Sequence, residues 1–596
     1  MLTLFHEIQQ AAAAAVKDHY GIEVDAQSLL VQETRKDFDG DFTLVTFPLT
    51  RFKLGSPVQI GETLGALLQE RLPFVARFNV IQGFLNLSLS EQFWLDFLAD
   101  FQHREDFFRM DTGIGQRVVV EYCSPNTNKP LHLGHLRNIT LGYALSQILR
   151  AAGFEVAEVC LYNDRGTAIC KSMYAWQQAG REETPESTGM KGDQLVGDYY
   201  VQYAKRLETE VAALVAQGME KEAAGKAAPS AQAVDEMLVQ WEAGDPAIRS
   251  LWERMNSWVY AAYLSTFARL GVQFDRFYYE SDLYQLGKES VLRGLEKGVF
   301  YQKEDGSVWV DLSGDGLDNK LLIRSNGTSV YITQDIATAE ARYEDYRMDR
   351  SVYVVGNEQE YHFKVLFLIM KKLGFAFSDG LYHLSYGMVD LPSGKMKSRE
   401  GTTVDADDLI EQVVATAREA TQELGKTEGM DDTGLEQLYE RLGLGALKFF
   451  LLKVDPKKRM LFDPAESVDL HGHTGPFVQY AYTRTAAIRR KGAEIAHFEK
   501  NMQPEDGLHE NEVTLLKRIF KYREVLQEAV AGYNPALIAN YAYELARDYN
   551  RFYHGDKILN PGSPQTSAFR FALSAFAGKA LLESMNLLGI EMPERM

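Results

Sequence analysis

The chain has 596 residues and a mass of 67.3 kDa, so it is long enough for about three or four domains of ordinary size. With 63 Lys and Arg residues against 83 Asp and Glu residues, its net charge of −20 argues against a protein that coats nucleic acid over its whole surface. No apolar run approaches the ~20 residues that span a membrane, and the first residues lack the pattern of a signal peptide. The three cysteines, Cys123, Cys160 and Cys170, cannot form a paired disulfide framework, so we expect a cytoplasmic protein with no membrane partner.

Residues 1–112 predict a small α+β domain. A helix is expected over residues 5–20, and the alternation of apolar and polar residues over 78–90 is typical of a strand. No catalytic grouping is visible in this part of the chain. A binding role is therefore the expectation for it.

Residues 117–152 predict a strand, a polar turn and a long helix. The β-branched run 117–122 is typical of a buried strand, and apolar residues recur at helical spacing up to residue 152, before Gly153. We expect the helix to start near Pro130 or Leu131 and to last about six turns. A helix that opens off the carboxyl end of a buried strand points its free N–H groups into the crevice where α/β sheets bind nucleotides. The sequence therefore predicts a phosphate site at this helix start.

The side chains at this helix start suit phosphate. His132 and His135 share one face of the first turn, Gly134 lets a flat group approach the backbone, and Lys129 adds a positive charge. One alternative is that the two histidines are ordinary polar packing residues. A zinc site lacks a third ligand at suitable spacing, so no metal site is predicted. Because there is neither a Gly-x-Gly-x-x-Gly nor a loop ending in Gly-Lys-Ser, a dinucleotide dehydrogenase or a P-loop enzyme is disfavoured.

The rest of the chain continues an α/β pattern and then becomes helical. Residues 154–162 predict a second strand, and a helical insertion follows over about 171–276. Further strands are expected at 307–312, at 320–324, at 329–332 after a hairpin turn at Asn326 and Gly327, and at 351–356. We therefore predict a multidomain protein of α/β and all-α parts: an N-terminal α+β domain (1–112), a Rossmann-like parallel-sheet catalytic domain (113–390), a loop with connecting helices (391–465) and a C-terminal helical bundle (466–596).

A second cluster of cations lies in residues 394–402. This glycine-flanked loop carries Lys395, Lys397 and Arg399. Most basic loops are merely solvated, but together with the histidine-bearing helix start this one could close over a triphosphate and neutralise the charge that develops as pyrophosphate leaves. Which of the three cations contacts phosphate stays open.

These motifs resemble those of class I aminoacyl-tRNA synthetases, with His-Leu-Gly-His at 132–135 in place of the family's His-Ile-Gly-His. Residues 124–137 are most similar to the arginyl-tRNA synthetase family. Residues 331–335, 356–359, 475–481 and 552–554 also look like motifs of that family, so the resemblance covers nearly the whole chain. One departure is Lys-Met-Lys-Ser-Arg at 395–399 in place of Lys-Met-Ser-Lys-Ser. Arginyl enzymes commonly lack a proper second lysine there, and the family interpretation assigns part of its work to Lys129.

The resemblance implies that ATP, accompanied by Mg²⁺, activates L-arginine to an adenylate, and that arginine then passes to the 3′-terminal ribose of tRNA(Arg). It also implies that tRNA is required for activation, and that the protein is a monomer. The implied catalytic residues are His132, His135, Lys129 and Lys397, and the implied ATP-binding residues add Gly134, Lys395 and Arg399. The implied arginine pocket has Glu121, Tyr331 and Asp335 around the guanidinium, with Ser124, Asn126 and Gln359 at the amino and carboxyl ends. The alternative is that Asp335 caps a helix and that Glu121 pairs with a core arginine.

By the same resemblance, the N-terminal unit would contact the tRNA elbow, and the domain after about residue 466 would bind the anticodon, with Met596 near it. This helical third concentrates cations, namely Lys453, Lys457, Lys458, Arg459, Arg484, Arg489, Arg490, Lys491, Lys517 and Arg518. Among them are aromatic residues that could stack on unpaired bases, although each taken singly is more often a core residue: Phe477, Tyr480, Tyr482, Tyr549, Phe552 and Tyr553.

Two other functions share some of these features. A small-molecule nucleotidyltransferase has the histidine motif and the fold, but it needs no separate basic helical third. A non-catalytic tRNA-binding paralogue could lose His132, His135 or Lys129, and all three are present.

Overall fold

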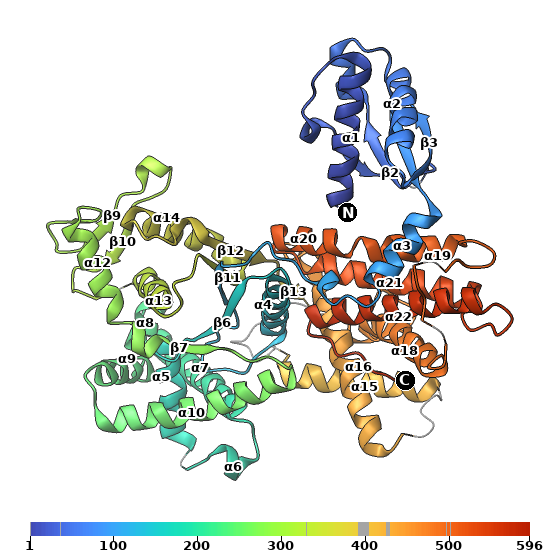
Figure 1. The fold of residues 1–596 in the computed structure, drawn as a ribbon. Coiled ribbons are helices and arrows are strands. Elements are labelled where there is room, and N and C mark those ends of the chain that lie inside the picture. The colour runs from blue at the N-terminus through green and yellow to red at the C-terminus, as the bar shows by residue number, and fades with distance from the viewer. Residues whose placement is uncertain are drawn as a thin grey trace.

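The computed structural model describes residues 2–35, 37–180, 182–328, 330–390, 404–424, 430–495, 497–500 and 502–596. Figure 1 shows the N-terminal domain set apart from the rest, a central sheet with helices around it, and a helical domain that carries the C-terminus.

The N-terminal domain packs two helices against an antiparallel sheet of order β1-β2-β4-β3. Its elements are α1 (Leu2–Tyr20), β1 (Val31–Glu33), β2 (Phe42–Val45), α2 (Pro57–Arg71), β3 (Val75–Ile81) and β4 (Phe84–Leu89). The single strand predicted over 78–90 is wrong, because this segment is a hairpin of β3 and β4. Gln82 and Gly83 form the turn with φ of 52° and 86°. Across a two-residue turn with positive φ, the alternation of apolar and polar residues continues from one strand into the next. The sequence pattern alone therefore does not reveal the turn.

The central part is built on a parallel sheet of order β12-β11-β5-β6-β7. Its strands are β5 (Arg117–Glu121), β6 (Glu155–Tyr162), β7 (Arg276–Tyr279), β11 (Arg350–Gly356) and β12 (Leu381–Tyr386). The chain runs outward from β5 through β6 to β7 and then returns on the other side with β11 and β12. The strand order therefore reverses between β5 and β11, and α/β sheets bind ligands in the crevice at such a point.

Helix α4 (Leu133–Ala151) connects β5 to β6 and lies between the sheet and the helical domain. It begins about two residues later than the sequence predicts, because His132 caps it. Most of its side chains are buried, since it also packs on helices α16, α20 and α22. A helix buried on nearly all sides cannot shift without disturbing both domains. The packing therefore holds the start of α4, where the phosphate site is predicted, in a fixed position.

Helices are inserted on both sides of β7. Between β6 and β7 lie α5 (Thr167–Ala175), α6 (Pro185–Thr188), α7 (Gly192–Ala216), α8 (Lys221–Ala227), α9 (Pro229–Glu242) and α10 (Pro246–Arg269). Between β7 and β11 lie α11 (Glu280–Leu283), α12 (Leu286–Glu296), an antiparallel sheet of β8 (Tyr301–Gln302), β9 (Val308–Val310) and β10 (Lys320–Ile323), and α13 (Tyr331–Tyr346). Helix α14 (Glu360–Leu373) joins β11 to β12.

The strand predicted at 329–332 is wrong, because Tyr331 is the first residue of α13. The β-branched composition favours a strand, but the Thr333 side chain decides otherwise. Its hydroxyl accepts the Val330 N–H at 3.1 Å and donates to the Leu322 carbonyl at 3.2 Å. This cap starts a helix and fixes it to β10.

The remaining third of the chain is mostly helical, with a short pair of strands. Its elements are β13 (Val389–Asp390), α15 (Ala406–Leu424), α16 (Asp432–Leu452), β14 (Met460–Leu461), α17 (Pro464–Ser467), α18 (Gly475–Lys491), α19 (Glu510–Phe520), α20 (Tyr522–Gly532), α21 (Ala536–Gly555) and α22 (Pro564–Leu587). Helices α18, α21 and α22 pack on one another, and their buried Tyr549, Phe569 and Leu573 belong to the large core that also includes α4.

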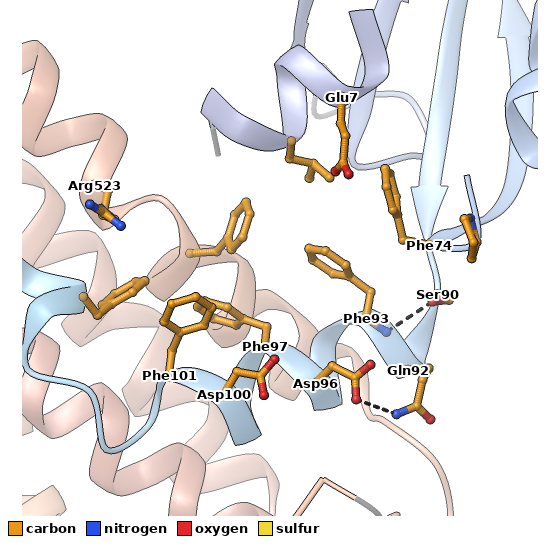
Figure 2. Close-up of a pocket in the computed structure, with 14 residues that line it drawn as sticks. Glu7, Phe74, Ser90, Gln92, Phe93, Asp96, Phe97, Asp100, Phe101 and Arg523 are labelled. Atoms are coloured by element: carbon orange, nitrogen blue, oxygen red, sulfur yellow. Dashed lines mark hydrogen bonds between the residues drawn. The ribbon is translucent and has the colours of Figure 1, made fainter. Parts of the chain in front are cut away.

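Helix α3 (Glu91–Phe101) joins the N-terminal domain to the helical domain, and a cavity of about 590 Å³ lies between them. Figure 2 shows Phe74 and Glu7 on the side of the N-terminal domain and Arg523 on the side of the helical domain, with Phe93 and Phe97 between them. Two ion pairs bridge the same domains, Asp41 with Lys517 and Glu33 with Lys521. The two domains are thus joined by apolar contacts and by ion pairs.

Candidate active site

The start of α4 presents two imidazoles in a defined tautomer. The Gly134 N–H donates to Nδ1 of His132 at 3.1 Å, and the His132 N–H donates to Nδ1 of His135 at 3.1 Å. The two rings lie 4.0 Å apart. Because each Nδ1 accepts a hydrogen bond, the proton of each neutral ring lies on Nε2, which is then a donor.

Burial keeps both histidines neutral. It lowers the pKa of His132 to about 4, with a further contribution from the charge of Lys129, and it holds the pKa of His135 well below its ordinary value. At neutral pH the two side chains therefore act as uncharged hydrogen-bond donors beside the free N–H groups of a helix start, where anions bind.

The turn between β5 and α4 is held by a side chain that sequence reasoning missed. Cys123 has a φ of 53°, and its N–H donates to Oδ1 of Asn138 at 2.6 Å. Nδ2 of Asn138 donates to the Val354 carbonyl of β11 at 2.7 Å. Asn138 thus joins the two strands that flank the crevice. A polar residue on an otherwise apolar helix face is the signal that could have identified it.

Lys129 lies at the end of this turn, in the lining of a cavity of about 270 Å³ that also includes His132 and Asp405. The hydroxyl of Tyr263 on α10 contacts the carbonyls of Lys129 at 2.6 Å and Asn126 at 3.0 Å. The insertion therefore fixes the backbone that carries Lys129.

The topology brings the predicted arginine-site residues to one edge of the sheet. Glu121, Ser124 and Asn126 follow the carboxyl end of β5, and Gln359 follows that of β11. Helix α13 runs back to the start of β11, so its own start, with Tyr331 and Asp335, lies at the same edge. Tyr331 is 79% exposed. Asp335 accepts a hydrogen bond from the His362 side chain at 2.7 Å. It therefore does not act as the helix cap that the alternative interpretation expects.

Glu121 has partners within the chain. Its Oε2 pairs with Nη1 of Arg342 at 2.5 Å, and its Oε1 accepts the Ser124 hydroxyl at 2.6 Å. Arg342 is fully buried on α13. These contacts match the alternative in which Glu121 pairs with a core arginine, and they leave its charge compensated.

A second carboxylate lies near Asp335. Glu280 begins α11 directly after β7, so it stands at the carboxyl edge of the sheet. Burial, helped by the negative charges of Asp164 and Asp335 and opposed by Arg165, raises the pKa of Glu280 to about 7. The sequence analysis missed Glu280, although its position directly after the aromatic run at the end of β7 could have suggested it.

The predicted phosphate-binding cations Lys395, Lys397 and Arg399 lie outside the described residues. Chain segments on both sides of 391–403 contact α4. Arg137, which is fully buried, donates to the Gly387 carbonyl at 2.8 Å and to the Lys458 carbonyl at 2.9 Å. Directly after residues 391–403, the Ala406 N–H donates at 2.9 Å to the carbonyl of Leu131, in the turn before α4.

The described residues include one grouping of possible metal ligands, His509, Glu512 and Asp556, in the helical domain. Arg570 donates to Glu512 at 2.6 Å and contacts His509 at 3.1 Å. A guanidinium thus already compensates these carboxylates, and the grouping does not fit a cation site.

Fewer of the aromatic residues predicted to stack on bases are accessible in the helical domain than the sequence suggests. Tyr482, Tyr549 and Phe552 are at most 3% exposed, so a stacking role for them is wrong. They fill the packing between helices, where an aromatic ring contributes most of its apolar area. Most of the predicted cations pair with carboxylates of the chain itself, namely Lys453, Arg459, Arg489, Arg490, Lys517 and Arg518.

A smaller aromatic surface remains between α18 and α21. The guanidinium of Arg484 lies 4.6 Å from the ring of Tyr480 and 5.2 Å from that of Tyr553, and it donates to Asn550 at 2.5 Å. Phe477, Tyr480 and Tyr553 are half-buried. The tail that ends at Met596 lies against α18, because Glu594 pairs with Arg489 at 2.6 Å.

A parallel sheet whose switch point faces a helix start with two histidine donors fits a class I aminoacyl-tRNA synthetase, and the match to a family model assigns the chain to this class. A family model described as tRNA synthetases class I (R), catalytic domain, matches residues 101–463, and one described as DALR anticodon binding domain matches residues 478–596. This chain belongs to the arginyl-tRNA synthetase family.

Relatives match over their full length. The arginine–tRNA ligase of Bacteroides thetaiotaomicron is 51% identical over 583 residues, which cover 98% of each chain. That of Parabacteroides distasonis is 49% identical over 597 residues, which cover 100% of each chain. Among solved structures, the arginyl-tRNA synthetase of Thermus thermophilus is 24% identical, covers 99% of both chains and has a TM-score of 0.77, so it shares the fold. The described residues contain no helix that is both long and apolar enough to cross a membrane.

Proposed function

We propose that this protein activates L-arginine with ATP and transfers it to the 3′-terminal ribose of tRNA(Arg). The observation that carries the proposal is the pair of Nε2 donors of His132 and His135 at a helix start beside the switch point. A small-molecule nucleotidyltransferase would share this pair, but it would not need the domain over residues 478–596 that matches an anticodon-binding family.

In the first step, a carboxylate oxygen of arginine attacks the α-phosphorus of ATP. The new oxygen–phosphorus bond forms while the bond to the bridging oxygen breaks, and pyrophosphate leaves with the bonding electrons. His132 and His135 donate to phosphate oxygens, whose charge grows in the transition state, and Lys129 and Lys397 supply positive charge. Gly134, Lys395 and Arg399 complete the ATP site, and Mg²⁺ accompanies ATP as part of the substrate.

Arginine is selected by carboxylates at the edge of the sheet. A guanidinium is planar and permanently charged, and it offers five donors in a fixed fork. We assign its recognition to Asp335 and Glu280, with Tyr331 beside them. Glu121 orients Ser124, because Arg342 already compensates its charge.

The other end of arginine meets the two loops that flank the crevice. Ser124 and Asn126 follow β5, and Gln359 follows β11, so these three side chains can hold the amino and carboxyl groups from both sides of the switch point.

The tRNA is bound by the domains outside the sheet. The N-terminal domain contacts its elbow, and the helical domain after about residue 466 binds its anticodon, where Tyr480, Arg484 and Tyr553 stack on unpaired bases. Activation requires this tRNA, as the family resemblance implies. We further propose that the protein is cytoplasmic, since the three cysteines are buried and free, and that it is a monomer, as the family resemblance implies.

The test is ATP–pyrophosphate exchange with each of the twenty amino acids, with and without total tRNA. Arginine alone should support exchange, and only when tRNA is present. Exchange with another amino acid would overturn the assignment of substrate. Robust exchange without tRNA would overturn the tRNA requirement and leave the substrate assignment standing.

A further inference from the structure

The segment that follows residues 391–403 crosses the start of α4. The Ala406 N–H donates to the Leu131 carbonyl at 2.9 Å, and Asp405 forms an antiparallel bridge with His132. This short backbone pairing includes His132, which caps α4 and whose imidazole we propose to donate to the phosphates of ATP. The position of the segment therefore affects where His132 stands.

Side chains of the insertion hold this segment. Nζ of Lys191 donates a hydrogen bond to Oδ2 of Asp407 at 2.5 Å, and the Thr266 hydroxyl donates one to Oδ1 of Asp407 at 3.1 Å. Lys191 also donates to Thr266 at 2.5 Å, and Gln194 donates to Asp405 at 3.3 Å. Lys191 caps α7 and Thr266 lies on α10, so two helices of the insertion meet at one carboxylate.

Helix α7 has little freedom to move at this point. A Cβ atom at Gly192 would lie 2.2 Å from the Trp258 carbonyl oxygen of α10, and one at Gly197 would lie 2.7 Å from Cδ of Pro130. Glycines at both positions let α7 approach α10 on one side and the turn after β5 on the other. Lys191 is therefore presented to Asp407 from a closely packed support.

Lys191 is also close to the carboxylates of Asp193 and Asp407, and Asp405 lies near them. Asp193 is 1% exposed, and burial raises its pKa to about 6, while the charges of Asp405 and Asp407 raise it and that of Lys191 lowers it. Without Lys191, Asp407 would lose the cation that it pairs with, and Asp193 would lose the positive charge that lowers its pKa, which disfavours the observed close arrangement.

We infer that Lys191 is a positioning residue for adenylate formation: through Asp407 it fixes the Asp405–Ala406 backbone against Leu131 and His132, and so couples the helical insertion to the phosphate-binding histidine. The inference rests on the proposed role of His132. Lys191 itself contacts no substrate. Its removal should therefore lower the rate of the chemical step and leave the binding of arginine intact.

The experiment compares the full-length variants K191M, K191R and D407N with wild type in tRNA-dependent ATP–pyrophosphate exchange. K191M should lower kcat by about 10²-fold, the loss that a small misplacement of a catalytic group can cause, while KM for arginine stays at its wild-type value. K191R should recover much of the rate because it keeps the charge. The matched control is K226M, which removes an exposed lysine of the same insertion whose partner is Glu222.

A double-mutant cycle tests whether Lys191 acts through Asp407. The K191M/D407N double variant should lose no more kcat than the more impaired of the two single variants, because both changes break one contact. Additive losses, a kcat of K191M equal to that of K226M, or a parallel change of kcat and KM would each overturn the inference. If K191M melts below the assay temperature, D407N keeps the side-chain volume and carries the same expectation. Failure of wild type to use arginine would instead overturn the proposed function.

Discussion

At the scale of single residues, the two histidines of α4 work as a pair because each Nδ1 is already occupied. Nδ1 of His132 accepts the Gly134 N–H, and Nδ1 of His135 accepts the His132 N–H, so the rings are oriented before any phosphate arrives. A donor that needs no reorganisation contributes most to a transition state. The hydrogen bonds that cap α4 thus also orient the two groups that we propose to act on ATP.

The first prediction concerns His135→Ala. Losing one preorganised donor should lower the adenylation rate by about 10²–10³-fold while the affinity for arginine is kept. Single-turnover adenylate formation at saturating ATP and arginine measures the rate, and His103→Ala, at an exposed histidine, is the control. A collapse of arginine affinity with the rate unchanged would contradict the assignment.

The second prediction concerns pH and the arginine pocket. Burial raises the pKa of Glu280 to about 7, so in the free enzyme the carboxylate is lost as the pH falls through 7. Because a guanidinium prefers the charged form, KM for arginine should rise as the pH is lowered from about 8 to 6, by at most about tenfold per unit below the pKa.

Two variants test this pocket. Glu280→Gln should have a high KM that no longer varies with pH in this range. Asp335→Asn should reduce kcat/KM for arginine by about 10²-fold or more, because removing one partner of a buried charge pair costs roughly 3–5 kcal/mol, and it should spare ATP binding. A flat KM in wild type would contradict the role of Glu280.

Single residues also show what the sequence could and could not predict. His132, His135 and Lys129 were predicted because a strand run, a polar turn and a helical run lie side by side in the chain, and the chemistry of that junction is local. Glu280 and Arg342 were missed because their roles arise only when β7 and α13 come to the edge of β5. A carboxylate or an arginine has no pattern of its own that reveals such a distant partner.

At the scale of elements, α18 and α21 carry those residues, among the aromatic residues predicted to stack on bases, that are still accessible in the described part of the helical domain. Asn550 holds Arg484 between Tyr480 and Tyr553, so the guanidinium is oriented before RNA binds. Arg484→Ala should weaken tRNA binding, and Tyr480→Ala should cost about 1–3 kcal/mol if a base stacks there.

Filter binding over a range of salt concentrations measures both effects. The salt slope of Arg484→Ala should fall by about 1 if its guanidinium contacts a phosphate. Arg418→Ala, whose arginine pairs with Glu436 on the connecting helices, is the control. Unchanged affinity in both Arg484→Ala and Tyr480→Ala would place the RNA elsewhere.

Elements that the sequence misassigned share one cause. The hairpin of β3 and β4 was predicted as a single strand because its turn at Gln82 and Gly83 keeps the alternation going. The start of α13 was predicted as a strand because the cap by Thr333 depends on β10, which lies beside it only in the fold. The long elements α4, β6 and β11 were predicted, since their periodicity is contained within each segment.

At the scale of the whole molecule, the N-terminal domain is attached to the helical domain partly by ion pairs. Asp41 pairs with Lys517 and Glu33 pairs with Lys521. Lys517 is 40% exposed and Glu33 is 39% exposed, whereas their partners Asp41 and Lys521 are 6% and 28% exposed. Salt at 1 M shortens the screening length to about 3 Å, so the domains should separate partly and the radius of gyration should increase.

Small-angle scattering at low and high salt measures this change. The double variant E33Q/D41N should be expanded already at low salt and respond little to more, whereas E23Q, which breaks a pair within the N-terminal domain, should behave as wild type. A radius of gyration that is constant in wild type would show that the apolar contacts around Phe93 and Phe97 alone hold the domains together.

The order of the strands also affects how the protein is made. The crevice lies between β5, which ends at Glu121, and β11, which begins at Arg350. At a synthesis rate of ~5–20 residues per second, the roughly 230 residues between them take about 10–50 s to emerge from the ribosome. During this time one edge of β5 has no partner, and an unpaired edge is a template for pairing with other chains. The helices inserted between β6 and β11 therefore delay closure of the sheet, and the newly made domain is exposed to aggregation until β11 arrives.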